Sequence, residues 1–136
     1  MSKQATVIVL HVGRSMSTCF KDPVTGEQVT RFDSAMKAVD KWVEHLAMFG
    51  GQDEMGLVLY GTDETEHDLD EDTLANVTVF NQVEKGSLVM LNKLSEISST
   101  DCLEGDSIGA MIVGLDMLEK RTKNKKYQRQ IILITD

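Results

Sequence analysis

The chain has 136 residues, of which 41% are hydrophobic and 26% are charged, which is typical of one globular domain. Its formal net charge of −8 argues against a nucleic-acid-binding surface on these residues by themselves. No apolar run approaches the roughly 20 residues that cross a bilayer, so no membrane partner is expected. Cys19 and Cys102 fit no metal-binding spacing and favour a reducing, intracellular compartment.

The first half of the chain predicts a strand, a helix and a second strand. Residues 6–10 form a β-branched apolar run, typical of a strand buried on both faces. After a polar, turn-rich passage, Thr30 and Asp33 form a capping-box pattern before apolar residues at helical spacing. Two glycines at residues 50–51 are expected to end this helix, and residues 55–60 predict the next strand.

The second half predicts an edge strand, two helices and a final strand. Residues 77–80 are a short β-prone run, expected at a sheet edge. Residues 88–97 carry a narrow apolar stripe and residues 108–118 a stronger one, each at helical spacing. Residues 130–135 predict a third buried strand. This alternation predicts a doubly wound, mostly parallel α/β sheet with helices on both faces.

The chain ends on a strand, which would leave an apolar sheet edge uncovered. Residues 1–136 are therefore expected to form the front part of a larger domain, incomplete at its C-terminal side. In such a sheet, ligands collect at the carboxyl ends of the strands. The loops expected there are residues 11–17, 61–63 and 105–107, together with Asp136.

The loop after the first strand has the layout of a metal-binding Asp-x-Ser-x-Ser motif, but His11, Gly13 and Ser15 occupy its three positions. Mg²⁺ requires several hard oxygen ligands, and only Asp136 and the serine hydroxyls offer them here. No metal and no cofactor are therefore expected. A lone histidine has no second nitrogen ligand nearby in sequence, so His11 is interpreted as a packed side chain that hydrogen-bonds to Asp136.

Catalytic motifs are missing from the sequence. There is no phosphate-binding Gly-x-x-x-x-Gly-Lys loop, and residues 105–109 are glycine-rich but lack the lysine. There is also no Gly-x-Ser-x-Gly nucleophile turn. The chain is predicted not to be an enzyme, and no residue is assigned as catalytic.

Four segments in chain order carry a family resemblance: residues 7–17, residues 53–65 with the following Asn-Val-Thr-Val, residues 105–116 and residues 126–136. They resemble the amino-terminal von Willebrand A-like domain of the Ku family, specifically that of the larger subunit of the Ku heterodimer. The Gly-Thr-Asp-x-Thr segment is the most specific part.

The metal-binding members of the wider von Willebrand A superfamily give a reference for the degenerate site. Ser15 and Asp136 match their ligand positions, whereas His11 and Gly13 depart from them. Gly105 stands where a ligating threonine is usual. The resemblance thus implies the fold while placing metal-dependent ligand binding in doubt.

The resemblance implies a nuclear protein at chromosome ends and break sites that pairs with a smaller Ku subunit. The full-length heterodimer would thread onto double-stranded DNA ends and act in non-homologous end joining and telomere maintenance. This domain would lie outside the DNA ring and receive repair or telomere factors. A helicase label with ATP dependence is sometimes given to the family, and these residues offer no support for that activity.

An acidic loop suggests where such factors bind. Leu69 and Leu74 lie in or beside the acidic residues 63–72, and Met111 and Ile112 lie on the neighbouring predicted helix. An apolar notch with an acidic rim would accept a short basic peptide that carries one or two bulky apolar residues. Alternatively, Met111 and Ile112 are ordinary core residues. Leu69 is the sharper candidate, because an isolated leucine in a charged loop has no obvious packing partner.

Two other functions stay open at the level of sequence. One is a degenerate von Willebrand A scaffold of another nuclear complex, of the proteasomal ubiquitin-receptor or transcription-repair factor type. The other is a Mg²⁺-dependent ligand-binding A domain, which the scarcity of oxygen ligands disfavours.

Overall fold

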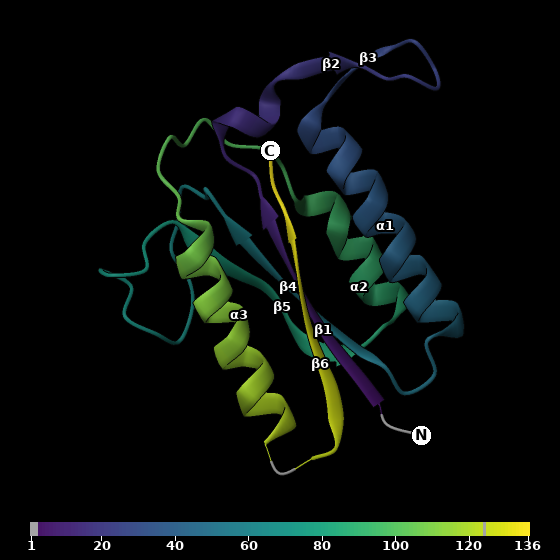
Figure 1. Ribbon diagram of the computed structural model, residues 1–136, viewed down its shortest axis with the longest axis vertical. Helices are drawn as coiled ribbons and strands as arrows, with labels where there is room; N and C mark the ends of the chain where they lie inside the picture. The colour runs from purple at the N-terminus through teal and green to yellow at the C-terminus, as the bar shows by residue number, and fades with distance from the viewer. Residues whose placement is uncertain (1–2, 124) are drawn as a thin grey trace.

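Four strands pair into one sheet that lies between helices in the computed structural model, which describes residues 3–123 and 125–136 (Figure 1). Strands β4 (Glu54–Tyr60), β1 (Lys3–His11) and β6 (Tyr127–Ile134) run parallel. Strand β5 (Val77–Lys85) pairs antiparallel with β4, which gives the order β5-β4-β1-β6. The predicted mostly parallel α/β architecture is confirmed.

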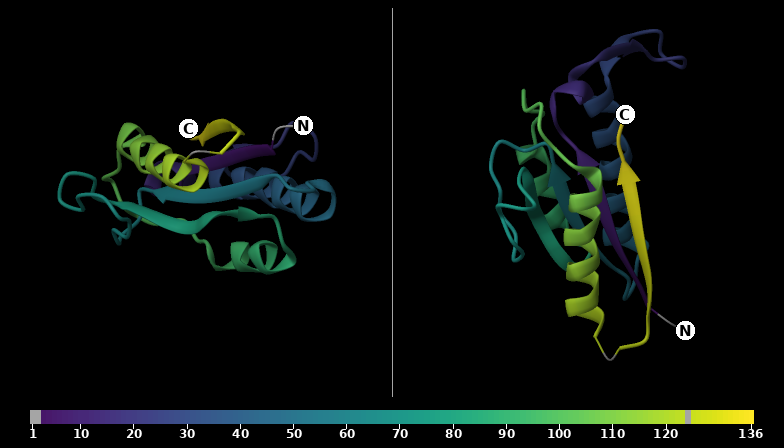
Figure 2. Two further views of the ribbon diagram at one scale, coloured as in Figure 1. Left: turned by 90° about the horizontal axis from the view of Figure 1, so that it is seen from below. Right: turned by 60° about the vertical axis from the view of Figure 1, so that its left-hand side comes forward.

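The helices divide between the two faces of the sheet (Figure 2). Helix α1 (Arg31–Phe49) and helix α2 (Leu88–Lys93), which continues into the 3-10 turn η2 (Leu94–Glu96), pack on one face. Helix α3 (Ser107–Thr122) packs on the other. No helix within the described ranges is both long and apolar enough to cross a bilayer.

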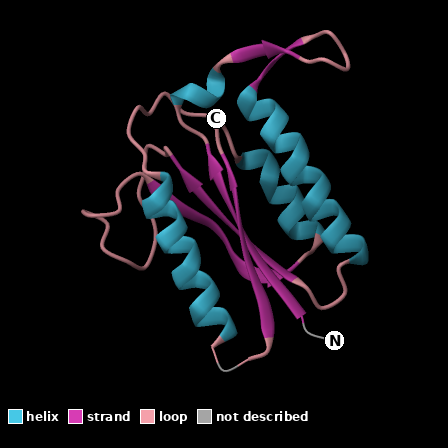
Figure 3. Cartoon of the chain, in the orientation of Figure 1, coloured by secondary structure: helices cyan, strands magenta, loops and turns pink. Residues whose placement is uncertain are grey.

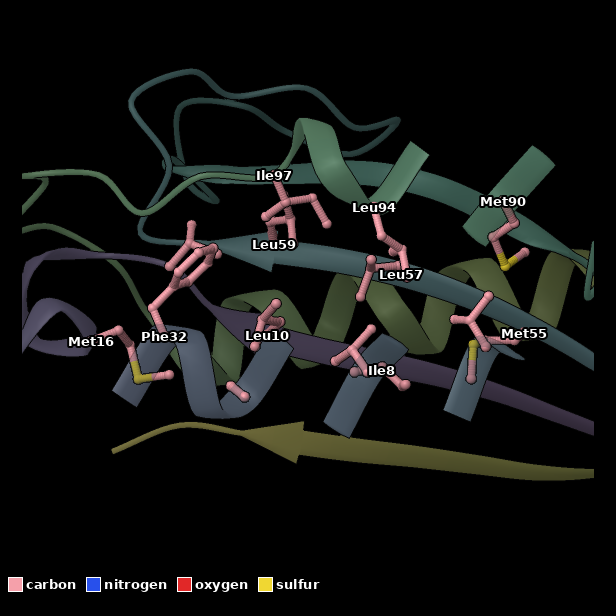
Figure 4. Packing of buried hydrophobic residues seen from close by; sticks show 14 residues of the cluster. Ile8, Leu10, Met16, Phe32, Met55, Leu57, Leu59, Met90, Leu94 and Ile97 are labelled. Atoms are coloured by element: carbon pink, nitrogen blue, oxygen red, sulfur yellow. The ribbon is translucent and has the colours of Figure 1, made fainter. Parts of the chain in front are cut away.

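Strand β1 is buried on both faces, and its alternate side chains supply two separate cores. Ile8 and Leu10 pack with α1, α2 and η2, as Figure 4 shows. Val7 and Val9 point to the opposite face and pack with α3. A continuous apolar strand is therefore the expected sequence for this position.

Side-chain caps fix where the helices begin. The Thr30 hydroxyl accepts a hydrogen bond from the Asp33 N–H at 3.0 Å, as the capping-box pattern predicts. Asp106 caps α3 by accepting from the Ile108 N–H at 3.0 Å. Because Asp106 follows directly on Gly105, this cap places the start of α3 beside the carboxyl ends of the strands.

A buried carboxylate connects α3 to the amino ends of the strands. Glu54 is 3% exposed, and it accepts from Arg121 Nε at 2.6 Å and from the Tyr127 hydroxyl at 2.5 Å. Burial alone would raise the pKa of Glu54, but the hydrogen bonds from Arg121 and Tyr127 and the charge of Arg121 lower it overall. This group joins three elements at the end of the sheet opposite the carboxyl-end loops.

Two details differ from the sequence-based expectations. The polar passage after β1 contains a 3-10 turn, η1 (Arg14–Ser17), and a small hairpin, β2 (Cys19–Lys21) with β3 (Gln28–Thr30). Figure 3 shows this hairpin beyond the N-terminal end of α1. Strand β5 does lie at a sheet edge, but it extends to Lys85.

The last strand completes the described part of the sheet. Strand β6 pairs with β1. Its side chains are half-buried or exposed among the described residues, and Leu133 is 38% exposed. Full burial was expected for a larger domain, so it stays a prediction.

Candidate functional site

The loops at the carboxyl ends of the strands meet in one place. The Val12 N–H donates to the Tyr60 carbonyl oxygen at 2.9 Å, and the Arg14 N–H donates to the Cys102 carbonyl oxygen at 3.0 Å. The Thr100 hydroxyl bonds the Gly61 carbonyl oxygen. The structure thus brings the loop after β1, the loop after β4 and the segment before α3 together, as the predicted topology requires.

His11 fills the space between these loops. Its ring stacks on that of Tyr60, with centroids 4.5 Å apart and planes 6° from parallel. A Cβ atom added to Gly13 would lie 2.8 Å from His11 Nε2. Gly61 has φ of +77°, and a Cβ there would lie 2.8 Å from the Gly13 nitrogen. At Gly105 a Cβ would lie 3.1 Å from the Gly61 Cα. Gly13 and Gly61 therefore leave room for the imidazole, and Gly105 allows its loop to approach Gly61 closely.

Asp136 is held by several polar side chains around it. His11 Nδ1 lies 3.0 Å from its Oδ1, which is the hydrogen bond predicted from the sequence, and Arg31 Nη1 lies 3.3 Å from its Oδ2. Ser15 Oγ lies 3.5 Å from His11 Nδ1. Hydrogen bonding to Ser15 and then to His11 outweighs partial burial and holds the pKa of Asp136 at about 2.

This donor set does not fit Mg²⁺. Asp136 holds the carboxylate position after the last strand, and both of its oxygens already face His11 or Arg31. Within residues 3–123 and 125–136, no group of three His, Cys, Asp or Glu side chains is placed to hold a metal ion. A divalent cation would have to displace a positively charged guanidinium to reach the carboxylate. The arrangement is suited to joining loops, not to metal chemistry.

Sequence reasoning missed two members of this cluster. Arg31 is the first residue of α1, and no motif links it to Asp136, 105 residues later in the chain. Tyr60 is the last residue of β4, and its hydroxyl donates to Thr135 Oγ1 at 2.7 Å. The position of Tyr60 at the end of a predicted strand was the one sequence feature that could have placed it in this cluster.

The acidic loop between β4 and β5 is fixed by its own side chains. His67 accepts from the Leu69 N–H at 3.1 Å through Nδ1 and donates to the Leu74 carbonyl oxygen at 2.7 Å through Nε2. This pair of bonds requires the neutral imidazole with its proton on Nε2. Asp70 bonds the Thr73 hydroxyl at 2.8 Å, and this bond is the main cause of its lowered pKa. Leu69 and Leu74 are thus held in defined positions.

The structure brings together three of the four residues suggested for the notch. Leu69, Leu74 and Met111 are half-buried and pack against the core beneath α3. Gly109 makes room for Leu74, because a Cβ there would lie 3.1 Å from Leu74 Cδ2. Ile112 is 45% exposed and lies outside this cluster. The expectation that Leu69 has no packing partner is wrong, because the loop folds back onto the α3 side of the sheet.

Comparison with known proteins identifies relatives of this architecture. A family model described as the Ku70/Ku80 N-terminal alpha/beta domain matches residues 5–136. X-ray repair cross-complementing protein 5 of Dictyostelium discoideum is 33% identical over 134 residues, covering 98% of this chain and 17% of that protein. ATP-dependent DNA helicase II subunit 2 of Aspergillus oryzae is 31% identical over 137 residues, covering 98% of this chain and 18% of that protein.

A solved structure supports the fold at much lower sequence similarity. An uncharacterised membrane-spanning protein from Vibrio fischeri superposes with a TM-score of 0.60 and 11% identity. The match covers 85% of this chain and 50% of that one, and it shows the fold alone. The chain spans less than a fifth of the length of the two relatives above. From the family match over residues 5–136, the chain belongs to the Ku70/Ku80 N-terminal alpha/beta domain family, and its relatives are of the Ku80 type.

Proposed function

We propose that this domain is a protein-docking module of a nuclear Ku-type subunit that binds double-stranded DNA ends with a smaller partner subunit. Its relatives include a protein named for X-ray repair, which supports a role in double-strand break repair by non-homologous end joining. Telomere maintenance at chromosome ends is proposed on the family resemblance alone. The net charge of −8 favours a position away from the DNA phosphates.

A binding role for the domain fits its chemistry better than catalysis does. The helicase name belongs to the Aspergillus relative, and the sequence of this chain has no phosphate-binding loop. At the carboxyl ends of the strands, where α/β enzymes usually place their chemistry, His11 and Arg31 both contact Asp136. The membership in the Ku family also removes the proteasomal and transcription-repair alternatives.

The observation that carries the docking proposal is the fixed acidic loop against α3. His67 and Asp70 hold Leu69 and Leu74 beside Met111, so an apolar surface is present without any rearrangement. Asp68 on the rim is exposed, and its contact with Lys120 Nζ is 3.9 Å long. Ile112 is exposed on α3 and lies outside this cluster. A short peptide with Lys or Arg beside one or two bulky apolar residues matches this surface.

Peptide binding can be measured by fluorescence anisotropy on the full-length protein. The probe is a short labelled peptide in which lysines flank a tryptophan. Leu69→Arg should weaken its binding by about tenfold or more, because an anchor contact is lost and a like charge is added. Since Leu69 is half-buried, Asp68→Lys on the exposed rim provides a second variant that leaves the core unchanged. Unchanged affinity in both folded variants would overturn the notch.

DNA-end binding needs a separate test on the same proteins. The full-length protein is expected to co-purify with a smaller homologue and to bind blunt duplex ends without sequence preference. Leu69→Arg should leave this activity intact, because the notch lies on the α3 side of an acidic domain. Failure to pair with a homologue and to bind ends would refute the Ku-type function. Joint loss of end binding and peptide binding in the variant would refute an independent docking role.

A further inference from the structure

A second apolar surface lies on the opposite face of the domain from the acidic loop. Helices α1 and α2 pack side by side there (Figure 1). Between them is a groove of about 560 Å³, which we call the α1–α2 groove. Its apolar lining includes Phe32, Met36 and Leu91, and Leu94 and Ile97 of the following turn complete it. The groove therefore has apolar walls on both sides.

The groove has an acidic centre. Asp40 and Glu44 lie one turn apart on α1, in line with Met36, and both line the groove. No lysine or arginine is among its lining residues, and within the described part of the chain no ion pair of 4.0 Å or less involves either carboxylate. Partial burial of the carboxyl group, and then the charge of Glu44, raise the pKa of Asp40. A cation placed in the groove would relieve this repulsion.

Exposed apolar side chains follow at the other end of the two helices. The next position of the α1 row is Met48, which is 63% exposed, and α2 begins with Leu88, which is 66% exposed. The last turns of α1 lie beside the residue pair that precedes α2, because a Cβ at Gly86 would be 2.8 Å from Leu46 Cγ. Large apolar side chains with this exposure are available for contact with another molecule. Along this row of α1, an apolar residue (Met36) is followed by two acidic residues and then by an apolar one (Met48).

We propose that the α1–α2 groove docks an amphipathic helix of a partner protein that carries Lys or Arg between apolar side chains. Residues 32–48 of α1 span about 24 Å at 1.5 Å per residue, which is the length of a helix of four to five turns. Basic residues four apart on that helix would face Asp40 and Glu44, and its apolar residues would contact the two ends. A second copy of the chain is a poor occupant, because each copy carries a net charge of −8.

The test uses full-length protein and a labelled helical peptide with two lysines four residues apart between leucines. A peptide with glutamates in place of the lysines is the charge control. The double variant Asp40→Asn with Glu44→Gln should weaken binding of the lysine peptide by about threefold to tenfold, as expected for two exposed charge pairs. Both positions are exposed, so the fold should be retained.

Matched variants separate this groove from other surfaces. Asp63→Asn with Glu64→Gln removes the same charge from the acidic loop and should leave affinity for the lysine peptide unchanged. Leu88→Ser should weaken binding without any change of charge, and Leu69→Arg should not affect it. Equal losses in the two charge variants, or equal binding of the glutamate peptide, would overturn the groove proposal. Loss of binding only in Leu69→Arg would assign the peptide to the notch instead.

Discussion

Two carboxylates at opposite ends of the same sheet have similar partners but different surroundings. Glu54 begins β4 and is 3% exposed, with Arg121 Nε at 2.6 Å. Asp136 follows β6 and its side chain is 23% exposed, with Arg31 Nη1 at 3.3 Å. The Glu54 carboxylate is buried between α3 and the strands while Arg121 is 44% exposed, whereas Asp136 lies among loops. We therefore expect burial of the carboxylate, and not the type of ion pair, to set how much each pair contributes to the free energy of unfolding.

Removal of Arg121 should have the largest effect on stability. Arg121→Ala would leave the buried Glu54 carboxylate with the Tyr127 hydroxyl as its remaining side-chain donor. We expect a loss of about 3 kcal/mol in the free energy of unfolding, because an uncompensated buried charge is costly. Urea unfolding at neutral pH measures this loss.

Two variants sharpen this result. Arg129→Ala removes an exposed arginine from β6 and should cost less than about 0.5 kcal/mol. Adding Glu54→Gln to Arg121→Ala should restore part of the stability, because a neutral amide tolerates burial better than a carboxylate. Equal losses for Arg121→Ala and Arg129→Ala would show that Glu54 does not depend on its partner.

A smaller effect is expected where His11 fills the carboxyl-end loops. Gly13→Ala would place a Cβ 2.8 Å from His11 Nε2 and 3.0 Å from the Cys102 carbonyl oxygen. The expected loss is about 1–3 kcal/mol, as for other overpacked sites. In a His11→Ala background the loss should fall by about 1 kcal/mol, because the imidazole no longer occupies that space.

A double-mutant cycle measured by urea unfolding gives this coupling directly. His45→Ala is the matched histidine control, since His45 is exposed on α1 and contacts Phe49. The Gly13→Ala penalty should be the same in that background as in the native chain. If the Gly13→Ala penalty is the same in the His11→Ala background as in the native chain, the ring does not fill the space between the loops.

Acidification should show the smallest of the three effects. The pKa of Asp136 is lowered from 3.8 to about 2, so its contribution is present above pH 4 and is lost as pH falls toward 2. Partial exposure limits this contribution to about 1–2 kcal/mol. Glu54 also has a lowered pKa, so its contribution is likewise lost on the acid side of its ordinary value of 4.5.

Unfolding midpoints from pH 5 to pH 2.5 test the Asp136 contribution. Asp136→Asn should be less stable than the native chain at pH 5 and should lose less stability on acidification. Asp63→Asn removes an equal charge from the exposed acidic loop and should retain the native acid dependence. If Asp136→Asn has the native pH dependence, its bonds to Ser15 and His11 do not stabilise the fold.

Much of the carboxyl-end site could be predicted from sequence because it depends on strand ends. Once residues 6–10 and the last strand are recognised as parallel neighbours, the loop after β1 and Asp136 must lie at the same edge. Arg31 could not be predicted, because its contact depends on where the N-terminus of α1 lies over that edge. The notch was predicted in part. Leu69, Leu74 and Met111 do lie together. Ile112 does not join them, because consecutive residues of a helix point about 100° apart.

From the sequence alone came the alternation of strands and helices, the cap at Thr30 and the scarcity of oxygen ligands in the loop after the first strand. Each of these depends on near neighbours in the chain. Only the packed structure shows that Glu54 is buried and that Leu69 packs against the core. These outcomes depend on which surfaces distant segments cover, because burial is a property of the packed molecule and not of a local pattern.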